Sequence, residues 1–287
     1  MDVAVVGAGR VGTAIAVLLR RAGHTVTAVS GRRATPARAA RHLPGVPVLA
    51  PSDAAGRGDL VLLAVPDDAL STMAVELAEA SALRPGAWAV HVSGAVGLEV
   101  LAPLVAAGAR RLAVHPLQTV PDVEGAIDRI PGSAVAVTAD DGEGAALGER
   151  LARDIGGHPF RLADERRPLY HAGAVFASNY VVTAAGIAEE LFREAGVPDP
   201  AAALVPLVRA SLDNVARLGP AGALTGPAVR GDAGTVARNL EALRDAAPHA
   251  VRGYVELCRL ALEIGERSGR LTAEGRAAVE EVLATWT

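Results

Sequence analysis

Three glycines near the start of the chain have the spacing of a site for a diphosphate group. They follow an apolar, β-branched run at residues 3–6 and precede a run of helix-forming residues. In such a strand–turn–helix unit the glycines permit a tight turn, a close approach of the phosphates and close packing of helix on strand. The free amides and positive end of the helix then face the anion. We expect the whole turn to bind a dinucleotide: Gly7, Ala8, Gly9, Arg10, Val11 and Gly12.

The end of the second expected strand indicates which dinucleotide would bind. Residues 25–30 end in Ser30, and Arg32 and Arg33 follow, so no carboxylate is present to hold a ribose diol. A hydroxyl beside two guanidinium groups suits a 2′-phosphate, which arginine can bind with two hydrogen bonds. The pattern predicts NADP, and therefore NADPH, as the cofactor. The alternative for the two arginines is a solvated helix start.

Further polar residues follow other expected strands, at the edge where ligands bind in open α/β sheets. We expect Val65, Pro66 and Ser93 to contact the cofactor. His91, His115 and Gln118 should gather near its nicotinamide end, with His91 and Gln118 toward the substrate and His115 as a proton donor. No third ligand stands at a useful spacing from the histidines, so no metal site is predicted.

Two clusters in the second half of the chain complete the candidate site. On an expected helix over residues 167–195, His171 and Ser178 share one stripe and Asn179 borders it, which favours a catalytic role for all three. Helix–helix packing is the alternative. Between later helices, a loop rich in Gly and Pro carries Thr225 and Arg230, which would suit a substrate carboxylate. An ion pair between Arg230 and Asp232 is equally compatible with the sequence.

Composition limits the possible functions. The chain has 287 residues and a formal net charge of -4, which favours neither nucleic acid nor an anionic membrane as partner. Its single cysteine, Cys258, excludes an internal disulfide. All 28 basic residues are arginine, so no mechanism can use a lysine. We expect a cytoplasmic protein that acts on a small molecule.

Apolar periodicity predicts two domains. Residues 1–160 alternate short strands with helices, which is typical of an α/β, Rossmann-like, doubly wound and mostly parallel sheet. Residues 161–287 show long helical periodicity, which predicts an all-α C-terminal domain for substrate binding and dimerisation. The expected strands lie at residues 3–6, 25–30, 60–65, 87–92, 111–115 and 134–138.

Six motifs together carry a family resemblance: GAGRVG, VPDD, HVSGAVG, HPLQT, YHAGAVFASN and LTGPAVRGD. They resemble a family of predicted oxidoreductases with a Rossmann-like domain and a helical C-terminal domain of unknown function. That family is distantly similar to pyrroline-5-carboxylate reductase, 6-phosphogluconate dehydrogenase and ketopantoate reductase. The resemblance implies a nicotinamide cofactor, a helical domain that forms a homodimer, and a small substrate with a carboxylate.

The chain departs from these better-known relatives at one position. Several of them use a helical lysine with an asparagine one turn later, and Asn179 matches that asparagine, but Val175 stands where the lysine would be. Either His171 or His115 then donates the proton, or the reaction needs no strong acid. A histidine acid would make activity fall as the pH rises past its pKa.

These observations predict an NADPH-dependent oxidoreductase that reduces a C=O or C=N bond. We expect a 2-keto acid similar to ketopantoate as the first substrate class and a cyclic imine such as pyrroline carboxylate as the second. A protein that binds NADP without catalysis, as a sensor or scaffold, is the alternative class.

Overall fold

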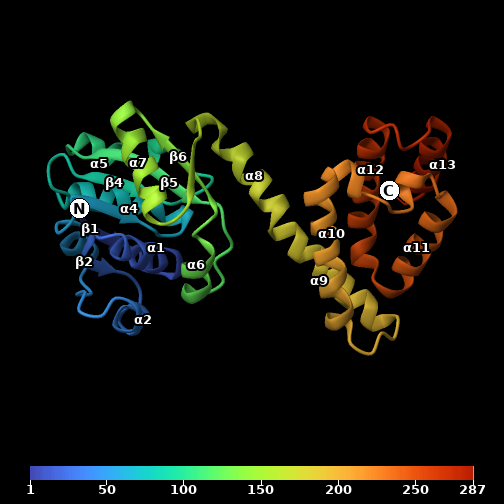
Figure 1. Cartoon of the computed structure of the whole chain (residues 1–287), viewed down its shortest axis with the longest axis horizontal. Helices are drawn as coiled ribbons and strands as arrows, with labels where there is room; N and C mark the ends of the chain where they lie inside the picture. The colour runs from blue at the N-terminus through green and yellow to red at the C-terminus, as the bar shows by residue number, and fades with distance from the viewer. Residues whose placement is uncertain (287) are drawn as a thin grey trace. The chain divides into compact units, whose positions relative to one another are not determined.

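The computed structural model describes residues 1–286 and divides into two compact units (Figure 1). The first unit comprises Met1–Ser178 and the second begins at Asn179. The expected division into a cofactor-binding domain up to residue 160 and a substrate-binding domain after it stays a prediction. None of the helices in the described part of the chain is long and apolar enough to cross a membrane.

The first unit is built on a seven-stranded sheet with the order β2-β1-β3-β4-β5-β6-β7. Neighbouring strands are parallel except β5 and β6, which confirms the mostly parallel fold predicted from the sequence. The strands are β1 (Asp2–Val6), β2 (Thr25–Ser30), β3 (Leu60–Leu63), β4 (Trp88–His91), β5 (Arg110–Pro116), β6 (Ala134–Ala139) and β7 (His158–Arg161). Strand β7 was not predicted, because it is a short, largely exposed edge strand with no apolar run.

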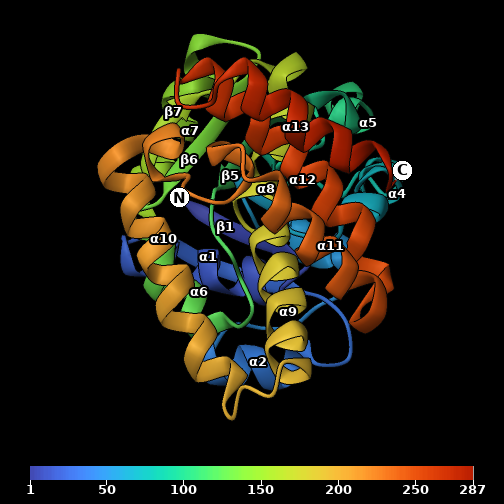
Figure 2. The same ribbon diagram turned by 90° about the vertical axis from the view of Figure 1, so that its right-hand side faces the viewer.

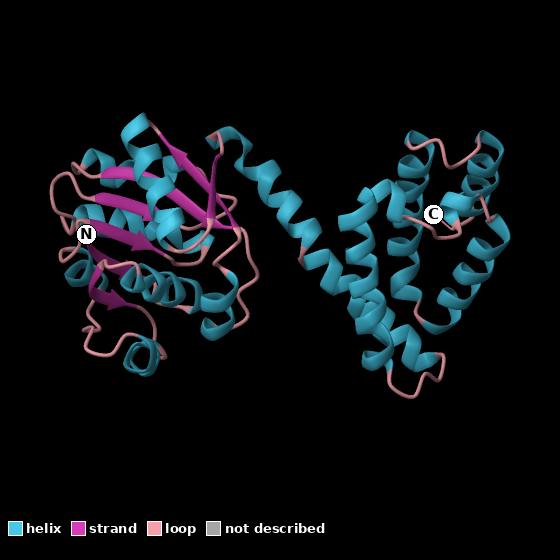
Figure 3. Cartoon of the chain, viewed as in Figure 1, coloured by secondary structure: helices cyan, strands magenta, loops and turns pink. Residues whose placement is uncertain are grey.

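Helices cover both faces of this sheet (Figure 3). One core packs β-strand side chains against α1, α6 and α7, and the other packs the alternate side chains against α3, α4 and α5. Because both faces of the sheet are buried, the central strands are continuous apolar runs in the sequence. The helices are α1 (Arg10–Arg21), α2 (Thr35–His42), α3 (Pro51–Ala55), α4 (Asp67–Glu79), η1 (Leu98–Leu101), α5 (Ala102–Ala106), α6 (Val123–Arg129), α7 (Gly142–Asp154), η2 (Asp164–Arg166) and α8 (Arg167–Ala177).

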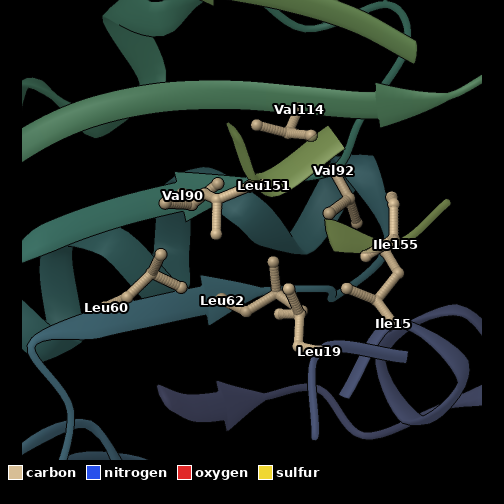
Figure 4. Close-up of a pocket in the computed structure, with 9 residues that line it drawn as sticks. All are labelled: Ile15, Leu19, Leu60, Leu62, Val90, Val92, Val114, Leu151 and Ile155. Carbon is tan, nitrogen blue, oxygen red and sulfur yellow. The ribbon is translucent and has the colours of Figure 1, made fainter. Parts of the chain in front are cut away.

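A small cavity lies in the first of these cores (Figure 4). Its volume is about 20 Å³, and all nine side chains that line it are aliphatic. A space of this size holds about one water molecule, and an apolar lining gives that water no partner. The cavity is therefore a packing gap between the sheet and helices α1 and α7. It is too small for any organic ligand.

The second unit is helical (Figure 2). Its core is formed by aliphatic side chains of α11, α12 and α13, including Leu240, Leu262 and Leu283. The elements are α9 (Asn179–Glu194), α10 (Pro200–Ala223), η3 (Ala228–Arg230), α11 (Ala233–Ala246), α12 (Pro248–Arg267) and α13 (Ala273–Ala284). Helix α10 is kinked at Gly219, whose φ of 70° is outside the helical region.

The expectation of one helix over residues 167–195 is wrong. Helix α8 ends at Ala177, and Ser178 has φ -125° and ψ -70°, so that α9 begins as a separate helix at Asn179. The shared stripe predicted for His171 and Ser178 assumed an unbroken helix. No Gly or Pro marks this break, so it could not be predicted from the sequence.

Candidate functional site

The turn between β1 and α1 depends on two glycines for its own packing. Gly7 has φ +94°, and a Cβ there would lie 2.6 Å from the carbonyl carbon of Ala64. A Cβ on Gly12 would lie 2.5 Å from the Gly7 carbonyl oxygen and 2.9 Å from the Cβ of Ala64. Both positions must therefore be glycine for β1, β3 and α1 to approach one another this closely.

Gly9 has a different environment. It is the N-cap residue of α1, with φ -76° and ψ -154°, which other residues also adopt, and no side chain caps the helix there. A Cβ on Gly9 would meet no atom closer than the Gly7 carbonyl oxygen at 3.9 Å. The fold does not need glycine here. Because Gly9 has no side chain, the first amides of α1 stay accessible to an anion.

These amides border a cleft of about 880 Å³ in the first unit. The cleft is large enough for a dinucleotide-sized ligand. Nine of the predicted cofactor residues line it: Gly7, Gly9, Arg10, Val11, Ser30, Arg32, Val65, Pro66 and Ser93. Ala8 and Gly12 are buried behind the turn, and Arg33 is exposed outside the cleft wall.

One end of the cleft is basic. Arg32 and Arg38 both line it, together with Thr35. Arg38 donates from Nη1 to the Ala8 carbonyl oxygen at 2.9 Å, which fixes its guanidinium beside the glycine turn. The sequence patterns did not indicate Arg38 or Thr35. A third arginine after β2, within the short helix α2, was the available signal for Arg38.

Ser93 lies at another part of the cleft wall, where the chain leaves β4. Its hydroxyl oxygen accepts hydrogen bonds from the amides of Ala95 at 3.2 Å and Val96 at 3.0 Å. Its carbonyl oxygen accepts a hydrogen bond from Nη2 of Arg167. Hydrogen bonds to both the side chain and the main chain of Ser93 thus hold the loop after β4 in place.

Arg167 is a buried cation that was not predicted as a site residue. Its side chain is 0 % exposed and donates to three uncharged acceptors: the carbonyl oxygens of Ser93 and Val96 (2.6 Å) and the Thr138 hydroxyl (2.9 Å). Burial lowers the pKa of this guanidinium, while the charge of Asp164 opposes the shift. An arginine at a helix start is usually solvated, so the position of Arg167 in the sequence did not indicate a buried structural role.

His91 lies in the interior rather than on the cleft wall. It is 0 % exposed, and neither ring nitrogen has a hydrogen-bond partner of normal geometry. Burial, together with the smaller effects of the nearby charges of Arg167 and His115, lowers its pKa to about 3. A neutral, enclosed ring cannot make the direct substrate contact expected from the sequence.

His115, Tyr170 and His171 meet beside Gly94, the residue after Ser93. Nδ1 of His115 lies 2.8 Å from the Tyr170 hydroxyl. A Cβ on Gly94 would lie 2.8 Å from Nε2 of His115 and 3.0 Å from Nδ1 of His171. Nδ1 of His171 is buried without a hydrogen-bond partner. Gly94 therefore leaves a space into which two imidazole nitrogens converge.

Electrostatics keep the His115–Tyr170 pair uncharged. Burial lowers the pKa of His115 to about 4, with smaller effects from Arg167 and His171. Burial also raises the pKa of Tyr170 to about 12, although the charge of Arg167 opposes the rise. At neutral pH both groups are hydrogen-bond donors or acceptors without charge. The expectation of an imidazolium acid therefore does not hold for His115.

The remaining predicted residues lie elsewhere. Gln118 is exposed and bonds within its own region, to the Arg129 carbonyl oxygen at 3.3 Å and the Thr119 amide at 2.8 Å. Arg230 donates to the Thr225 carbonyl oxygen at 2.5 Å and lies 3.8 Å from Asp232. Asn179, Thr225 and Arg230 belong to the second unit, and their roles stay predictions.

Two domain families match the sequence. Residues 1–116 match the Rossmann-like domain, and residues 133–261 match DUF2520, a domain of unknown function. No curated protein matches the sequence.

Solved structures share this fold over nearly the whole chain. A candidate NADP oxidoreductase from Bacteroides fragilis has a TM-score of 0.78 and 23% identity, with 91% of this chain and 98% of that one covered. An imine reductase from Streptomyces aurantiacus has a TM-score of 0.61 and 18% identity, with 99% of both chains covered. A reductive aminase from Aspergillus terreus, in complex with NADPH and ethyl levulinate, has a TM-score of 0.62 and 20% identity, with 98% of both chains covered.

These likenesses agree with the architecture described above and with the family resemblance of the six sequence motifs. The chain joins a Rossmann-like N-terminal domain to a helical C-terminal region of the DUF2520 type.

Proposed function

We propose that this protein is an NADPH-dependent oxidoreductase that reduces the C=O bond of a small carboxylate-bearing substrate. A 2-keto acid similar to ketopantoate is the favoured class. The observation that carries the proposal is the open main chain at Gly9, where α1 begins at the wall of a cleft of about 880 Å³. The packing of the turn does not require glycine at this position.

The cleft residues fit each charged part of the cofactor. The amides of Arg10 and Val11 at the start of α1 would hold the pyrophosphate. Arg32 and Arg38 would bind the 2′-phosphate that distinguishes NADPH from NADH, with Ser30 and Arg33 as the other predicted contributors. The Aspergillus terreus reductive aminase, which has the same fold, was solved in complex with NADPH.

The residues beside Gly94 fit the reduction of an acceptor group. When bound, the reduced nicotinamide would supply a hydride to the substrate carbon. His115 would donate a hydrogen bond from Nε2 to the substrate oxygen, since this nitrogen has no partner in the described chain and is not sealed from solvent. The buried charge of Arg167 would favour an anionic substrate. His171 and Ser178 remain further candidates for polarising the substrate, and Asn179 remains a candidate from the second unit.

Imine reduction is the second candidate. The Streptomyces aurantiacus imine reductase and the reductive aminase share the fold over nearly their full length. A neutral imine nitrogen has a lone pair and can accept the same hydrogen bond from His115 as a carbonyl oxygen. Cyclic imines of the pyrroline carboxylate type therefore stay the alternative substrate class.

The test has two stages. Fluorescence titration with NADPH and NADH measures binding, and we expect NADPH to bind at least tenfold more tightly. The protein is then incubated with NADPH and a panel of 2-keto acids and cyclic imines while the absorbance of the reduced nicotinamide is followed. Oxidation with a panel member supports the proposal. Tight binding without oxidation by any of them would favour a sensor or scaffold instead.

We further propose a homodimer formed through the helical unit. The support is a set of exposed aliphatic side chains on α9 and α10. Val182 is 70% exposed, Leu207 58% and Leu218 48%. Exposed apolar surface of this kind commonly marks an interface in an oligomer.

A further inference from the structure

Tyr170 is held in place by two aromatic neighbours. Its ring packs edge-on against His115, with centroids 5.6 Å apart and an interplanar angle of 87°. Phe160 contacts the same ring, with centroids 5.9 Å apart. The hydroxyl is thereby directed to Nδ1 of His115 at 2.8 Å. This contact leaves Nε2 as the nitrogen of His115 that is available to a ligand.

The surroundings of Nε2 suit a small substrate. This nitrogen lies 2.8 Å from the position that a Gly94 Cβ would occupy. It has no hydrogen-bond partner among the described residues, and it is not among the buried polar atoms. Ser93, which precedes Gly94, lines the cleft. A group placed at the Ser93–Gly94 end of the cleft would therefore meet Nε2.

We propose that Tyr170 is a positioning residue that fixes His115 with its proton on Nε2 and replaces that proton when the substrate takes it. This inference rests on the proposed function and deepens it. A phenol is the stronger hydrogen-bond donor and a neutral imidazole nitrogen the stronger acceptor, so Tyr170 donates to Nδ1. The hydrogen bond at one ring nitrogen then determines that the other carries the proton.

The proton transfer can be written so that it balances. As the substrate carbon accepts the hydride, the π electrons of the C=O bond move to oxygen. The oxygen bonds to the proton from Nε2 of His115, and the N–H electron pair stays on Nε2. Nδ1 then accepts the Tyr170 proton, and the phenol oxygen keeps its electron pair. His115 is neutral before and after the step, in agreement with a pKa of about 4.

The charge left on Tyr170 is temporary and is stabilised by Arg167, whose positive charge acts on this hydroxyl. An alkoxide is a stronger base than a phenolate, so the transfer from Tyr170 to the substrate oxygen is favourable. Water returns a proton to Tyr170 afterwards. The relay explains how a chain without lysine could supply a proton at neutral pH.

The same geometry restricts the substrate class. A donor at Nε2 needs an acceptor, which a carbonyl oxygen or a neutral imine nitrogen provides and an N-alkylated iminium ion does not. The positive charge of Arg167 also disfavours a cation here. The carboxylate of Asp164 offsets part of the Arg167 charge, and its oxygens accept from the Leu98 amide at 3.0 and 3.1 Å. The site therefore favours uncharged acceptor groups over iminium ions.

The decisive measurement is the tautomer of His115. Long-range ¹H–¹⁵N NMR of the whole protein with labelled histidine distinguishes the two neutral tautomers, and His115→Gln assigns the signal. We expect Nε2 to carry the proton in the unmodified protein and a mixture of tautomers in Tyr170→Phe. The turnover number of Tyr170→Phe with a carbonyl substrate should fall at least tenfold, while its Kd for NADPH stays within twofold.

Tyr254→Phe is the matched control. The hydroxyl of Tyr254 also makes side-chain hydrogen bonds, with Asn239 at 2.9 Å and with Cys258, but it lies in the second unit. Its loss should change neither the His115 tautomer nor turnover. An N-alkylated cyclic iminium ion should be reduced at least tenfold more slowly than the carbonyl substrate.

Several outcomes would overturn the proposal: a proton on Nδ1 in the unmodified protein, an unchanged tautomer in Tyr170→Phe, or equal turnover of the iminium ion. The first of these needs only the assignment variant His115→Gln and no cofactor. If Nε2 carries the proton but NADPH does not bind, the proposed function fails and the catalytic use of the pair fails with it, whereas the positioning of His115 by Tyr170 stands.

Discussion

The hydroxyl of Tyr170 lies 2.8 Å from Nδ1 of His115, and this contact determines which nitrogen of the imidazole can meet a ligand. The two residues are 55 positions apart, one on β5 and the other on α8. Helix α8 is anchored to the sheet by the buried Arg167, one turn before Tyr170. The site beside Gly94 is therefore assembled by packing and not by a local motif.

Gly94→Ala tests whether the space beside the two histidines matters. The new methyl group would lie within 3.0 Å of Nε2 of His115 and of Nδ1 of His171, so one ring must move. We expect turnover to fall about tenfold or more, because small displacements of a reacting group are costly. The Kd for NADPH should stay within twofold, since the glycine turn is unaffected.

Gly173→Ala is a suitable control for this variant, because a Cβ there would meet nothing within 4 Å and the residue is helical. It should leave turnover unchanged and raise the free energy of unfolding by about 0.5–1 kcal/mol. If Gly94→Ala turned over as fast as the unmodified protein, the converging nitrogens would have no role in the reaction.

Arg38→Ala tests the basic end of the cleft. Arg38 lines the cleft beside Arg32 and is oriented by the Ala8 carbonyl oxygen. Loss of one hydrogen bond to a charged group costs about 1.5–3 kcal/mol, which corresponds to a roughly tenfold or larger rise in the Kd for NADPH. Binding of NADH should change little. Isothermal titration with both cofactors measures this difference.

Arg41→Ala on the same helix serves as the comparison, since Arg41 pairs with Glu124 at 2.6 Å and does not line the cleft. Its Kd values should match those of the unmodified protein. Equal losses of NADPH and NADH affinity in Arg38→Ala would place the 2′-phosphate elsewhere.

The buried histidines predict an acid-sensitive fold. The pKa of His91 is lowered from 6.5 to about 3 and that of His115 to about 4, so the unfolded chain binds more protons below pH 6.5. Their contribution to stability is complete above pH 6.5 and is lost as the pH falls toward 4. At pH 5 the loss is on the order of 2 kcal/mol for each histidine.

Urea unfolding at pH 7 and pH 5 measures this loss. Replacement of the exposed His158 by Gln should leave the pH dependence unchanged. An NMR titration of the folded protein gives the direct check. A midpoint near 6.5 for His115 would show that its ring is not desolvated as the structure indicates.

The proposed homodimer can be tested on α10. Leu207 and Leu218 lie on one face of this helix, 58% and 48% exposed. Light scattering with size-exclusion chromatography should give twice the 29.1 kDa chain mass, and Leu207→Glu/Leu218→Glu should reduce it to one chain. Leu257→Glu on α12, where the leucine is 59% exposed, should remain dimeric. A monomeric unmodified protein would rule out the dimer.

Much of the fold could be predicted because its signals are local. The apolar run at residues 3–6, the spacing of Gly7, Gly9 and Gly12, and the small residues around Ser93 each specify a strand end or a turn. The helix break at Ser178 could not be predicted, because it lacks the Gly or Pro that usually marks one.

The candidate site was harder to predict because its members come from distant segments. Arg167 and Tyr170 act through contacts with Ser93 and His115, which lie 74 and 55 residues away. The periodicity of apolar residues along the sequence carries no information on such contacts. His91 shows the converse: its position at a strand end suggested a ligand contact, but it lies on a central strand whose two faces are both covered, and it is completely buried.

The proposed function requires that a negatively charged diphosphate binds at the exposed main chain of Gly9. Gly9→Val examines this contact, because the structure offers room and ordinary backbone angles for a side chain there. Gly142→Val, at the open first residue of α7, is the matched control. We expect Gly9→Val to melt within a few degrees of the unmodified protein and to bind NADPH at least a hundredfold more weakly, with the control unaffected. A folded Gly9→Val protein that bound NADPH as tightly as the unmodified one would show that the diphosphate does not bind at Gly9.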